Sequence, residues 1–568
     1  MDKLRIALIA AFATISFMLV IEYSNFKNEH TKNQLLQNSS QPTLTADTST
    51  PVADIDDSGV IPQLSSKPEK TGAPAKTDLI SVSTDNFIIK IDPTGGDIVY
   101  VALKEHLARI DTPNIPFAIL EHSNHRTYIT QSGLFGQNGT DSANKRPLFS
   151  SAESSYQMAE NAEQLVVDLH YQNQGSDITK RFTFKRGNYL IDVDYLIKNN
   201  SDETWKAGFY ALIKRDDSVD PARENDSSMG MQPYLGFATT TEKERFKKIH
   251  FKDIEEEKFK ESINGGWIAM IQHYFLSAWI GDQNQKNEYS TFRSKDGLNI
   301  ARMVSPITEV AAHSEGQIHA SFYVGPKDQY TLEKITENLD LSVDYGFLWM
   351  IAQPLYALLY FINNGQLHAF GKTFDIFGGL GNWGFSIIML TILVKALFFG
   401  LNKKAYTSMA KMRAIQPKML EIRDRYADDR QKQSQEMMSL YSKEGVNPVG
   451  GCLPMIVQMP VFISLYWVLR ESVELRHAPF IGYIKDLSTM DPYFIMPLIM
   501  GVSMFFQQKL NPPPPDPMQA KVMQFLPLIF TFFFLFFPAG LVLYWVVNNI
   551  LSIAQQWFIT KHLIGDNK

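Results

Sequence analysis

Long apolar runs occupy both ends of this 568-residue chain and limit the folds open to it. One run, Leu4–Ile21, follows Lys3 and Arg5. Six more lie beyond residue 346: Phe347–Ile362, Trp383–Leu401, Leu453–Leu469, Tyr493–Phe506, Val522–Phe537 and Leu541–Ile559. A helix needs roughly 20 mainly apolar residues to cross the hydrocarbon core of a bilayer. The sequence therefore predicts a membrane protein whose helices gather toward its C-terminus.

The first apolar run is interpreted as an uncleaved membrane anchor, residues 1–22. A cleaved signal peptide has the same charged start, but the small-residue site Ala11-Phe12-Ala13 falls inside the run. Residues 23–77 are rich in Ser, Thr, Pro, Asp and Asn, with few large apolar residues. Such a segment buries too little surface to offset chain entropy, so a disordered linker is expected.

The middle of the chain, residues 78–340, alternates apolar and polar residues with a period of two. Phe182 and Phe184 precede an Arg-Gly-Asn turn, and the next strand places Ile191, Val193 and Tyr195 on one face. Alternation around a turn is a hairpin signature. Similar segments recur to about residue 324, which predicts an all-β sandwich domain with a short helical end at Thr331–Leu339. The single cysteine, Cys452, excludes an intramolecular disulfide.

Charge places the segments relative to the membrane. The loop 402–448 carries ten Lys/Arg against six Asp/Glu, and loops with an excess of basic residues stay in the cytoplasm. The N-terminus is basic too, so the β domain is expected outside, and the chain must then cross an odd number of times before residue 402. Phe347–Ile362 is the shorter of the two runs in between and contains Pro354. We interpret it as a helix on the outer surface, with a re-entrant or tilted span as the alternative.

The predicted fold class is a multidomain membrane protein: an N-terminal anchor, an outer β-sandwich domain, and a C-terminal α-helical core. The core of five transmembrane helices covers residues 381–560 and includes a cytoplasmic helical hairpin, 402–448. An interfacial helix and loop, 341–380, precedes the core, and a cytoplasmic tail, 561–568, follows it. Two of the spans are short for a bilayer, which favours local thinning.

Lys395 is the one charged residue inside the five predicted spans. A charge near the bilayer centre costs about 2.5–3.5 kcal/mol on insertion scales and marks a functional candidate, although Lys395 lies near enough to the helix end to reach water by snorkelling. Polar residues recur on the same or other spans at helical spacing: Thr391, Gln458, Ser503, Gln507, Thr531, Tyr544, Asn548 and Ser552. Interhelical hydrogen bonding explains one or two of these. A polar stripe on every helix favours a water-containing groove.

The spans contain no Asp or Glu. A proton-coupled transporter usually needs an intramembrane acid or histidine, so the sequence disfavours that class. The countercharge to Lys395 is expected to come from a client, that is, from another polypeptide on which the protein acts. The acidic tail of such a client could supply it.

The cytoplasmic loop combines methionines at helical spacing with basic residues. The candidate residues for contact with a client polypeptide or with the ribosome are Met409, Met412, Arg413, Met419, Met437 and Met438. Packing of the two helices against each other accounts for most of these methionines, but flexible methionine surfaces also bind varied apolar segments. The basic residues suit ribosomal RNA or anionic headgroups. The formal net charge of -6 gives no reason to expect DNA binding.

Several segments strongly resemble the YidC membrane insertase family of Gram-negative bacteria, which is related to the mitochondrial Oxa and chloroplast Albino insertases. The segments are Gly381-NWGFSII, Tyr406-TSMAKMR, Gln435-EMMSLY, Asn447-PVGGCLPMIVQMPVF, Ser472-VELRHAPF, Asp491-PY, Met500-GVSMFFQQK and Pro538-AGLVLYWVVNN, with Gly265-GWIAMIQHYFLSAWI in the β domain. They cover nearly all of 381–556.

The resemblance implies a periplasmic β-supersandwich and an inner-membrane insertase and chaperone that is not an enzyme. It implies a hydrophilic groove, work alone or with the Sec translocon, and no nucleotide, cofactor or metal. Lys395 stands where the family usually has arginine, and Trp545 where a second tyrosine is common. The groove role carries over to Thr391, Gln458 and Tyr544. The alternatives are a membrane-anchored periplasmic enzyme or sugar-binding protein, and a solute transporter.

Overall fold

The computed structural model describes residues 79–142, 145–173, 175–223, 232–369, 372–446, 453–511 and 517–564. The predicted anchor (1–22) and linker (23–77) lie outside the described residues. The chain divides into two compact units, and one of them holds Asp57–Pro512 and Pro527–Lys568. Every contact between elements described below lies within that unit.

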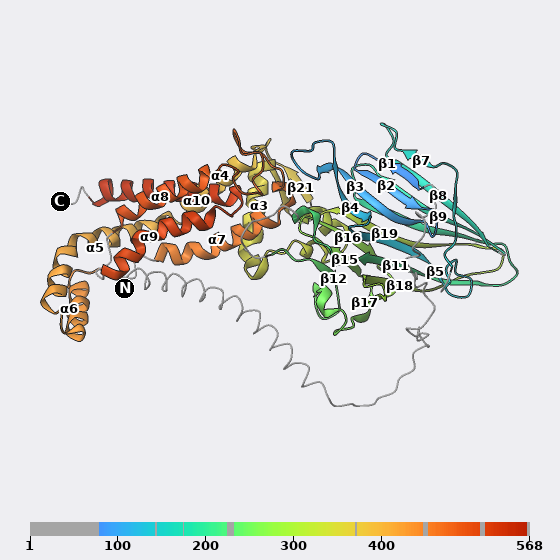
Figure 1. Cartoon of the computed structure of the whole chain (residues 1–568), viewed down its shortest axis with the longest axis horizontal. Coiled ribbons are helices and arrows are strands. Elements are labelled where there is room, and N and C mark those ends of the chain that lie inside the picture. Colours follow the sequence, from blue (N-terminus) through green and yellow to red (C-terminus); the bar gives the residue numbers. More distant parts are fainter. Residues whose placement is uncertain are drawn as a thin grey trace, which may run out of the picture. The chain divides into compact units, whose positions relative to one another are not determined.

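Two large sheets make up the β domain (Figure 1). The 10-stranded sheet has the order β14 (Lys260–Asn264), β17 (Lys286–Arg293), β18 (Asn299–Val310), β11 (Trp205–Arg215), β5 (Thr127–Phe135), β4 (Pro116–His122), β3 (Asp97–Leu107), β2 (Phe87–Asp92), β1 (Ile80–Ser83) and β7 (Ser155–Gln157). The 9-stranded sheet has the order β13 (Lys247–Ile249), β12 (Gly236–Thr239), β15 (Trp267–Ile271), β16 (Phe275–Ile280), β19 (Glu315–Pro326), β10 (Leu190–Asn199), β9 (Ser176–Lys185), β8 (Gln164–Asn173) and β6 (Ser150–Ser151).

The hairpin predicted from alternation is confirmed. β9 and β10 pair antiparallel, with Ile191 opposite Phe184 and Val193 opposite Phe182. All four of these side chains are buried, while their neighbours along each strand are more exposed. Burying an apolar side chain of this size contributes about 1.5–3 kcal/mol, which holds the pairing in register.

The sheets pack on one another through aromatic residues. Phe209 of β11 meets Trp279 of β16 edge-on, with ring centroids 5.7 Å apart. The indole of Trp279 donates a hydrogen bond to the Thr130 hydroxyl at 2.6 Å, and Tyr128 and Ser277 share another at 2.7 Å. One hydrophobic core therefore lies between the two sheets, and the predicted β sandwich is confirmed.

The rest of the described chain is mainly helical (Figure 1). The helices are α2 (Gln329–Ile335), α3 (Trp349–Asn364), α4 (Trp383–Leu397), α5 (Phe399–Arg425), α6 (Arg430–Lys443), α7 (Leu453–Glu471), α8 (Ile495–Leu510), α9 (Pro517–Phe534) and α10 (Ala539–Phe558). A small hairpin of β20 (Gln366–Ala369) and β21 (Lys372–Asp375) joins α3 to α4. Short turns include η4 (Gly346–Leu348) before α3 and η6 (Val473–Leu475) after α7.

The predicted span Trp383–Leu401 is broken in the structure. Its helix ends at Leu397, and α5 continues from Phe399 at an angle of 67° to α4. Gly400 lies just beyond the break and lowers the helical propensity there. Among the described residues, Gly346–Asn364 is the one helix long and apolar enough to cross a membrane by itself, and α4 with α5 qualifies as a bent pair.

α3 bridges the C-terminal end of α7 and the N-terminal end of α4. Before its first turn, Gly346 lies so close to Trp467 that a Cβ there would be 3.1 Å from the indole. In its middle, the Tyr356 hydroxyl donates to Glu474 at 2.7 Å. At its end, Ser386 of α4 donates to the Asn363 side chain at 3.2 Å. α3 therefore contacts neighbouring helix ends along its length.

The C-terminal end of α7 and the segment after it also join the bundle to the β domain. Glu471 forms a buried ion pair with Lys327 at 3.0 Å, and His273 contacts the Arg470 carbonyl oxygen at 2.9 Å. Val473 packs into the hydrophobic core of the β domain. Arg476 donates to the Leu107 carbonyl oxygen at 2.7 Å. These contacts join the β domain to the helices.

Candidate functional site in the helical bundle

Lys395 lies in the last turn of α4 with 3% of its surface exposed. Its ammonium donates a hydrogen bond to the Ser552 hydroxyl of α10 at 2.8 Å. Ser552 in turn donates to the Asn548 carbonyl oxygen at 2.7 Å, and the Tyr406 hydroxyl of α5 lies near it. No carboxylate among the described residues forms an ion pair with Lys395. A buried cation is thus held by neutral oxygen alone.

A second layer of polar side chains lies next to Lys395. The Asn402 amide of α5 donates to the Gln555 side chain of α10 at 3.2 Å. The Gln555 amide lies 3.5 Å from the Lys395 carbonyl oxygen, at the limit of a hydrogen bond. α4, α5 and α10 therefore meet around a continuous polar layer, which we call the Lys395 cluster: Lys395, Asn402, Tyr406, Ser552 and Gln555.

A different face of α10 is polar toward α8. The Asn549 amide donates to the Ser503 hydroxyl at 3.0 Å. One heptad later, Gln556 donates to the Leu510 carbonyl oxygen at 3.1 Å and to the Asn511 side chain at 3.2 Å. These contacts hold α8 against α10 by interhelical hydrogen bonds.

Two of the predicted groove residues direct their hydroxyls to their own helices. Thr391 donates to the Ile387 carbonyl oxygen at 2.6 Å, and Thr531 to the Pro527 carbonyl oxygen at 2.7 Å. Thr531 also lies against Gly501 of α8, where a Cβ would be only 2.0 Å from its hydroxyl oxygen. In this structure their hydroxyls are thus engaged within their own helices.

The aromatic members of the predicted set form one cluster. Trp545 meets Phe462 of α7 edge-on at 4.6 Å and packs on Phe534 of α9 at 5.1 Å. Tyr544 is buried and stacks on Phe462 at 6.2 Å. The Trp545 indole nitrogen and the Gln458 amide nitrogen are buried without a hydrogen-bond partner among the described residues.

The structure therefore unites some of the predicted residues and separates others. Lys395 and Ser552 meet at one place, where Asn548 contributes its backbone carbonyl oxygen. Ser503 joins α8 to α10, and Gln507 lies half-buried farther along α8. Tyr406, Asn549 and Gln556 were not predicted as site residues. The sequence could have indicated Asn549 and Gln556, because residues seven apart lie on the same face of a helix.

The methionines of the hairpin formed by α5 and α6 are mostly inside it. Met419 packs with Ile415 in a small core that Met412 and Met437 cover, whereas Met409 contacts Tyr406 and Ile559. Met438 is exposed, and so is Arg413. The exposed part of the hairpin therefore offers one methionine beside basic side chains.

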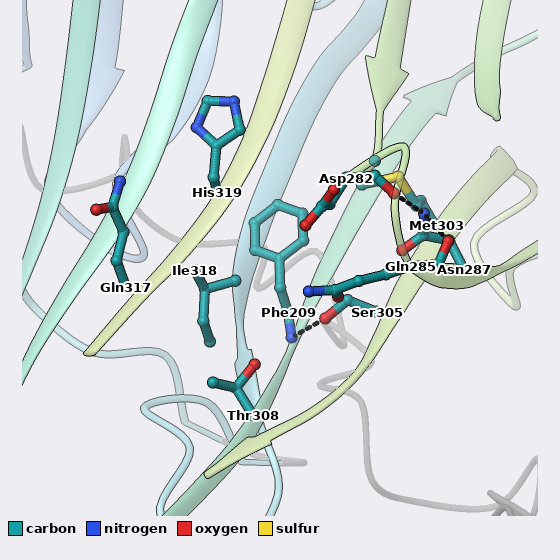
Figure 2. A pocket seen from close by; sticks show the side chains of 11 residues that line it. Phe209, Asp282, Gln285, Asn287, Met303, Ser305, Thr308, Gln317, Ile318 and His319 are labelled. Atoms are coloured by element: carbon teal, nitrogen blue, oxygen red, sulfur yellow. Dashed lines mark hydrogen bonds between the residues drawn. The ribbon is translucent and has the colours of Figure 1, made fainter. Parts of the chain in front are cut away.

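The β domain contains a cavity of about 310 Å³ between its sheets, lined by residues of β11, β18 and β19 and by the β16–β17 turn (Figure 2). Figure 2 shows Gln317 and His319 on one side and Asp282, Gln285 and Asn287 on the other. The hydrogen bond that His319 donates to the Asp194 carboxylate raises the pKa of His319. The lining has one aromatic ring, Phe209, which is 1% exposed and offers no open platform for a sugar. Among the described residues no group of His, Cys, Asp and Glu is placed to hold a metal ion.

A β-sandwich domain joined to a bundle of apolar helices around a buried lysine defines the chain as a multidomain membrane protein. Two family models match the chain. The model described as "YidC periplasmic domain" matches residues 79–358, and the one described as "60Kd inner membrane protein" matches residues 375–566. The chain belongs to the YidC family of membrane protein insertases.

Curated relatives agree along the whole chain. A membrane protein insertase YidC of Cellvibrio japonicus is 50% identical over 564 residues, covering 99% of this chain and 99% of the relative. One from Pseudomonas putida is 47% identical over 574 residues, covering 100% and 99%. A solved structure titled as an active YidC insertase covers 87% of this chain and 94% of its own, with 18% identity and a TM-score of 0.38, too low to add to the assignment. The relatives are inner-membrane proteins and carry the name of an insertase rather than that of an enzyme.

Proposed function

We propose that the Lys395 cluster receives the polar, acidic part of a client chain while the client's apolar helix passes sideways into lipid. The observation that carries the proposal is a buried lysine whose partner is a neutral serine, in spans that contain no Asp or Glu. A client carboxylate would replace the neutral hydroxyl acceptor with an anionic one, so that the buried cation gains an ion-pair partner.

The energy for insertion comes from burial of the client's apolar helix, and no nucleotide is required. The bundle lowers the cost of moving polar groups across. α4 has 15 residues and α8 has 16, which at about 1.5 Å per residue gives 22–24 Å against a hydrocarbon core of about 30 Å. Short helices favour thinning of the bilayer beside them, which shortens the path of a client's polar tail.

The proposed topology keeps both chain ends and the hairpin of α5 and α6 in the cytoplasm and the β domain in the periplasm, with α3 on the outer surface. The contacts of α3 support this placement. Its hydrogen bonds go to Glu474 just after α7 and to Ser386 in the first turn of α4, and Gly346 before it lies against Trp467 near the end of α7. α4, α7, α8, α9 and α10 are the five spans of the core.

The groups next to the cluster have separate roles in the proposal. Gln458 and Trp545 offer buried donors to a passing polar group, and Tyr544 lines the same aromatic wall. The exposed Met438 and Arg413 of the hairpin suit the first contact with a nascent chain or with the ribosome. Work beside the Sec translocon is part of the proposal, because larger clients need more than one small groove.

The test is insertion of one single-span client with an acidic tail into liposomes that hold the purified full-length protein and no nucleotide. Lys395→Ala should lower the yield about tenfold, corresponding to the loss of a contact of about 1.4 kcal/mol. Lys395→Arg should keep most of it. The matched control is Lys509→Ala, which removes one exposed cation from the end of α8.

A client whose tail carries no acid should respond weakly to the Lys395 variants. Equal insertion of both clients by the wild type and by Lys395→Ala would show that Lys395 only packs against Ser552. Dependence of insertion on ATP would contradict the proposed source of energy.

A further inference from the structure

The hairpin of β20 and β21 has two unlike faces. Its register places Gln366 opposite Asp375 and His368 opposite Thr373 on one face, and Leu367 opposite Phe374 on the other. Side chains alternate across a strand, so each cross-strand pair belongs to one face. The first face is polar. The second presents an aliphatic and an aromatic side chain, each 44% exposed.

The polar face is fixed to the protein. The His368 ring stacks on Tyr330 of α2 with centroids 3.7 Å apart and meets Tyr360 of α3 at 5.2 Å. Its Nδ1 shares a hydrogen bond with the Thr373 hydroxyl at 3.0 Å. The hairpin therefore has one orientation, and its apolar pair faces away from these contacts.

The base of the hairpin is closed by two glycines with positive φ. A Cβ at Gly365 would lie 1.8 Å from the Phe377 carbonyl oxygen, and one at Gly379 would lie 2.2 Å from the Asn363 carbonyl oxygen. Backbone packs on backbone here, which only glycine permits. The apolar pair is thus presented from a rigid support.

Exposed apolar side chains continue from the hairpin into α4. Ile376, Phe377 and Leu380 are exposed in the connection, although Phe377 also packs on Phe361. On α4 the exposed apolar residues are Phe385, Met389, Ile392, Leu393 and Leu397. Their spacing of four, three, one and four places them on one side of the helix. Exposed apolar side chains therefore continue along the chain from Leu367 and Phe374 to the face of α4 that lipid covers in the proposed topology.

We propose that the hairpin β20–β21 is a membrane wedge, with Leu367 and Phe374 inserted into the outer leaflet beside α4. The inference rests on the proposed topology. Apolar side chains of interfacial elements enter the headgroup and acyl boundary by about 5–10 Å. Lys372, on the same face as the apolar pair and exposed, lies where it meets lipid phosphates.

Lipid is the favoured partner of the apolar face of the hairpin, because exposed apolar residues continue from this face into α4. The face of α4 is apolar over two turns and joins the hairpin through residues 376–382, so both surfaces meet the same surroundings. A partner protein would need polar groups around its contact to exclude water at the rim, whereas the charged side chain that the described part of the hairpin presents on this face is the cation Lys372.

The experiment uses the full-length protein in nanodiscs, with Cys452→Ser removing the native thiol and single cysteines labelled with an environment-sensitive fluorophore. The tested positions are Leu367→Cys and Phe374→Cys. Thr373→Cys, on the opposite face of the same strand, is the matched control. Leu397→Cys on α4 reports the membrane span, and Leu148→Cys in the β domain reports water.

Brominated lipids should quench the labels at Leu367→Cys, Phe374→Cys and Leu397→Cys, and aqueous iodide should quench those at Thr373→Cys and Leu148→Cys. If iodide quenches both hairpin labels, the wedge proposal is contradicted. The proposed function and topology still stand if the protein inserts its client and the Leu397→Cys label remains in lipid. Iodide quenching at Leu397→Cys would overturn the topology itself. A photoreactive group at Phe374 should crosslink to lipid in membranes, and a crosslink to one protein in its place would overturn the choice of lipid.

Discussion

At the scale of single residues, the pair Lys327 and Glu471 shows how charge is used at the joint between the β domain and the bundle. Each side chain is 2% exposed, and the ammonium and carboxylate lie 3.0 Å apart. The Lys327 ammonium also lies 3.4 Å from the Ser342 carbonyl oxygen. Such a pair adds little over an apolar contact, but loss of one partner leaves a buried charge uncompensated.

Glu471→Ala should therefore lower the free energy of unfolding by about 3–5 kcal/mol, because Lys327 keeps its charge without a partner. The decrease in the free energy of unfolding is measured in detergent by monitoring a signal from the β domain during unfolding. Lys327→Met combined with Glu471→Leu should recover most of it.

The control is Glu309→Ala, which breaks the exposed pair with Lys206 and should cost no more than about 1 kcal/mol. A loss for Glu471→Ala as small as this would contradict the burial argument.

Sequence reasoning found some site residues and missed others for identifiable reasons. Lys395 stood out because it is the one charge in the spans. The placement of Ser552 on a polar face of α10 followed from helical spacing. The hydroxyls of Thr391 and Thr531 bond their own helices, which spacing does not reveal. The partners Lys327 and Glu471 are 144 residues apart, and no local pattern connects them.

At the scale of elements, the crossing of α8 and α9 depends on Gly501. A Cβ there would be 2.0 Å from the Thr531 hydroxyl oxygen and 3.2 Å from the Thr531 Cβ. Small residues allow membrane helices to approach this closely. Gly501→Ala should push the helices apart and cost about 1–3 kcal/mol by overpacking.

Adding Thr531→Ala to Gly501→Ala should restore much of the stability, since it removes the atom that clashes. Thermal unfolding in detergent measures the stability of the single and the double variant. Failure of the second substitution to rescue the first would place the strain elsewhere.

The docking of α3 is predicted to depend on pH through Glu474. Burial, and after it the charge of Asp328, raises the pKa of Glu474 from 4.5 to about 7. Because the folded pKa lies above the unfolded one, the folded state holds an extra proton between these values. The resulting stability is fully present below the unfolded pKa and is lost as the pH rises through the folded one.

Amides in the middle of α3, near Tyr356, should thus exchange faster at about pH 8 than at about pH 5, after correction for the intrinsic rate. Glu474→Gln should flatten this dependence, because an amide keeps a hydrogen bond to the Tyr356 hydroxyl without titrating. The Asp328, Tyr330 and Tyr345 side chains face the same carboxyl and remain in both chains. An unchanged pH profile in the Gln variant would assign the effect to one of them.

Element bounds followed the sequence more closely than tertiary contacts did. Apolar runs predicted α7 and α10 to within a few residues, because burial or lipid requires such runs. The helix expected at Thr331–Leu339 appears as α2, which ends at Ile335. The bend at Phe398 was missed, since a single glycine beyond it is compatible with a continuous helix.

At the scale of the whole molecule, Arg476 fastens the bundle to the β domain. Its guanidinium lies 5.0 Å from the Phe117 ring and 5.5 Å from the Phe275 ring, and it donates to the Leu107 and Ala108 carbonyl oxygens. Arg476→Ala should loosen the joint without unfolding either part. Faster hydrogen exchange around Ala108, with unchanged exchange in β9 and β10, is the expected result.

Arg476→Lys should be intermediate, because an ammonium keeps the charge but loses the planar stack. Exchange around Ala108 that is the same in all three chains would show that Val473 and the ion pair alone hold the joint.

The separation of Lys327 from Glu471 has a consequence for how the molecule is made. Lys327 follows the last strand of the β domain, and its partner is synthesised 144 residues later. At about 5–20 residues per second, the ribosome needs roughly 7–30 s to cover that distance. During this interval the outer domain can finish folding with its lysine in water and its surface for Arg476 open. The helices that are synthesised afterwards then dock on a β domain that has already folded. Each new copy of the protein therefore completes its helical bundle against its own folded outer domain.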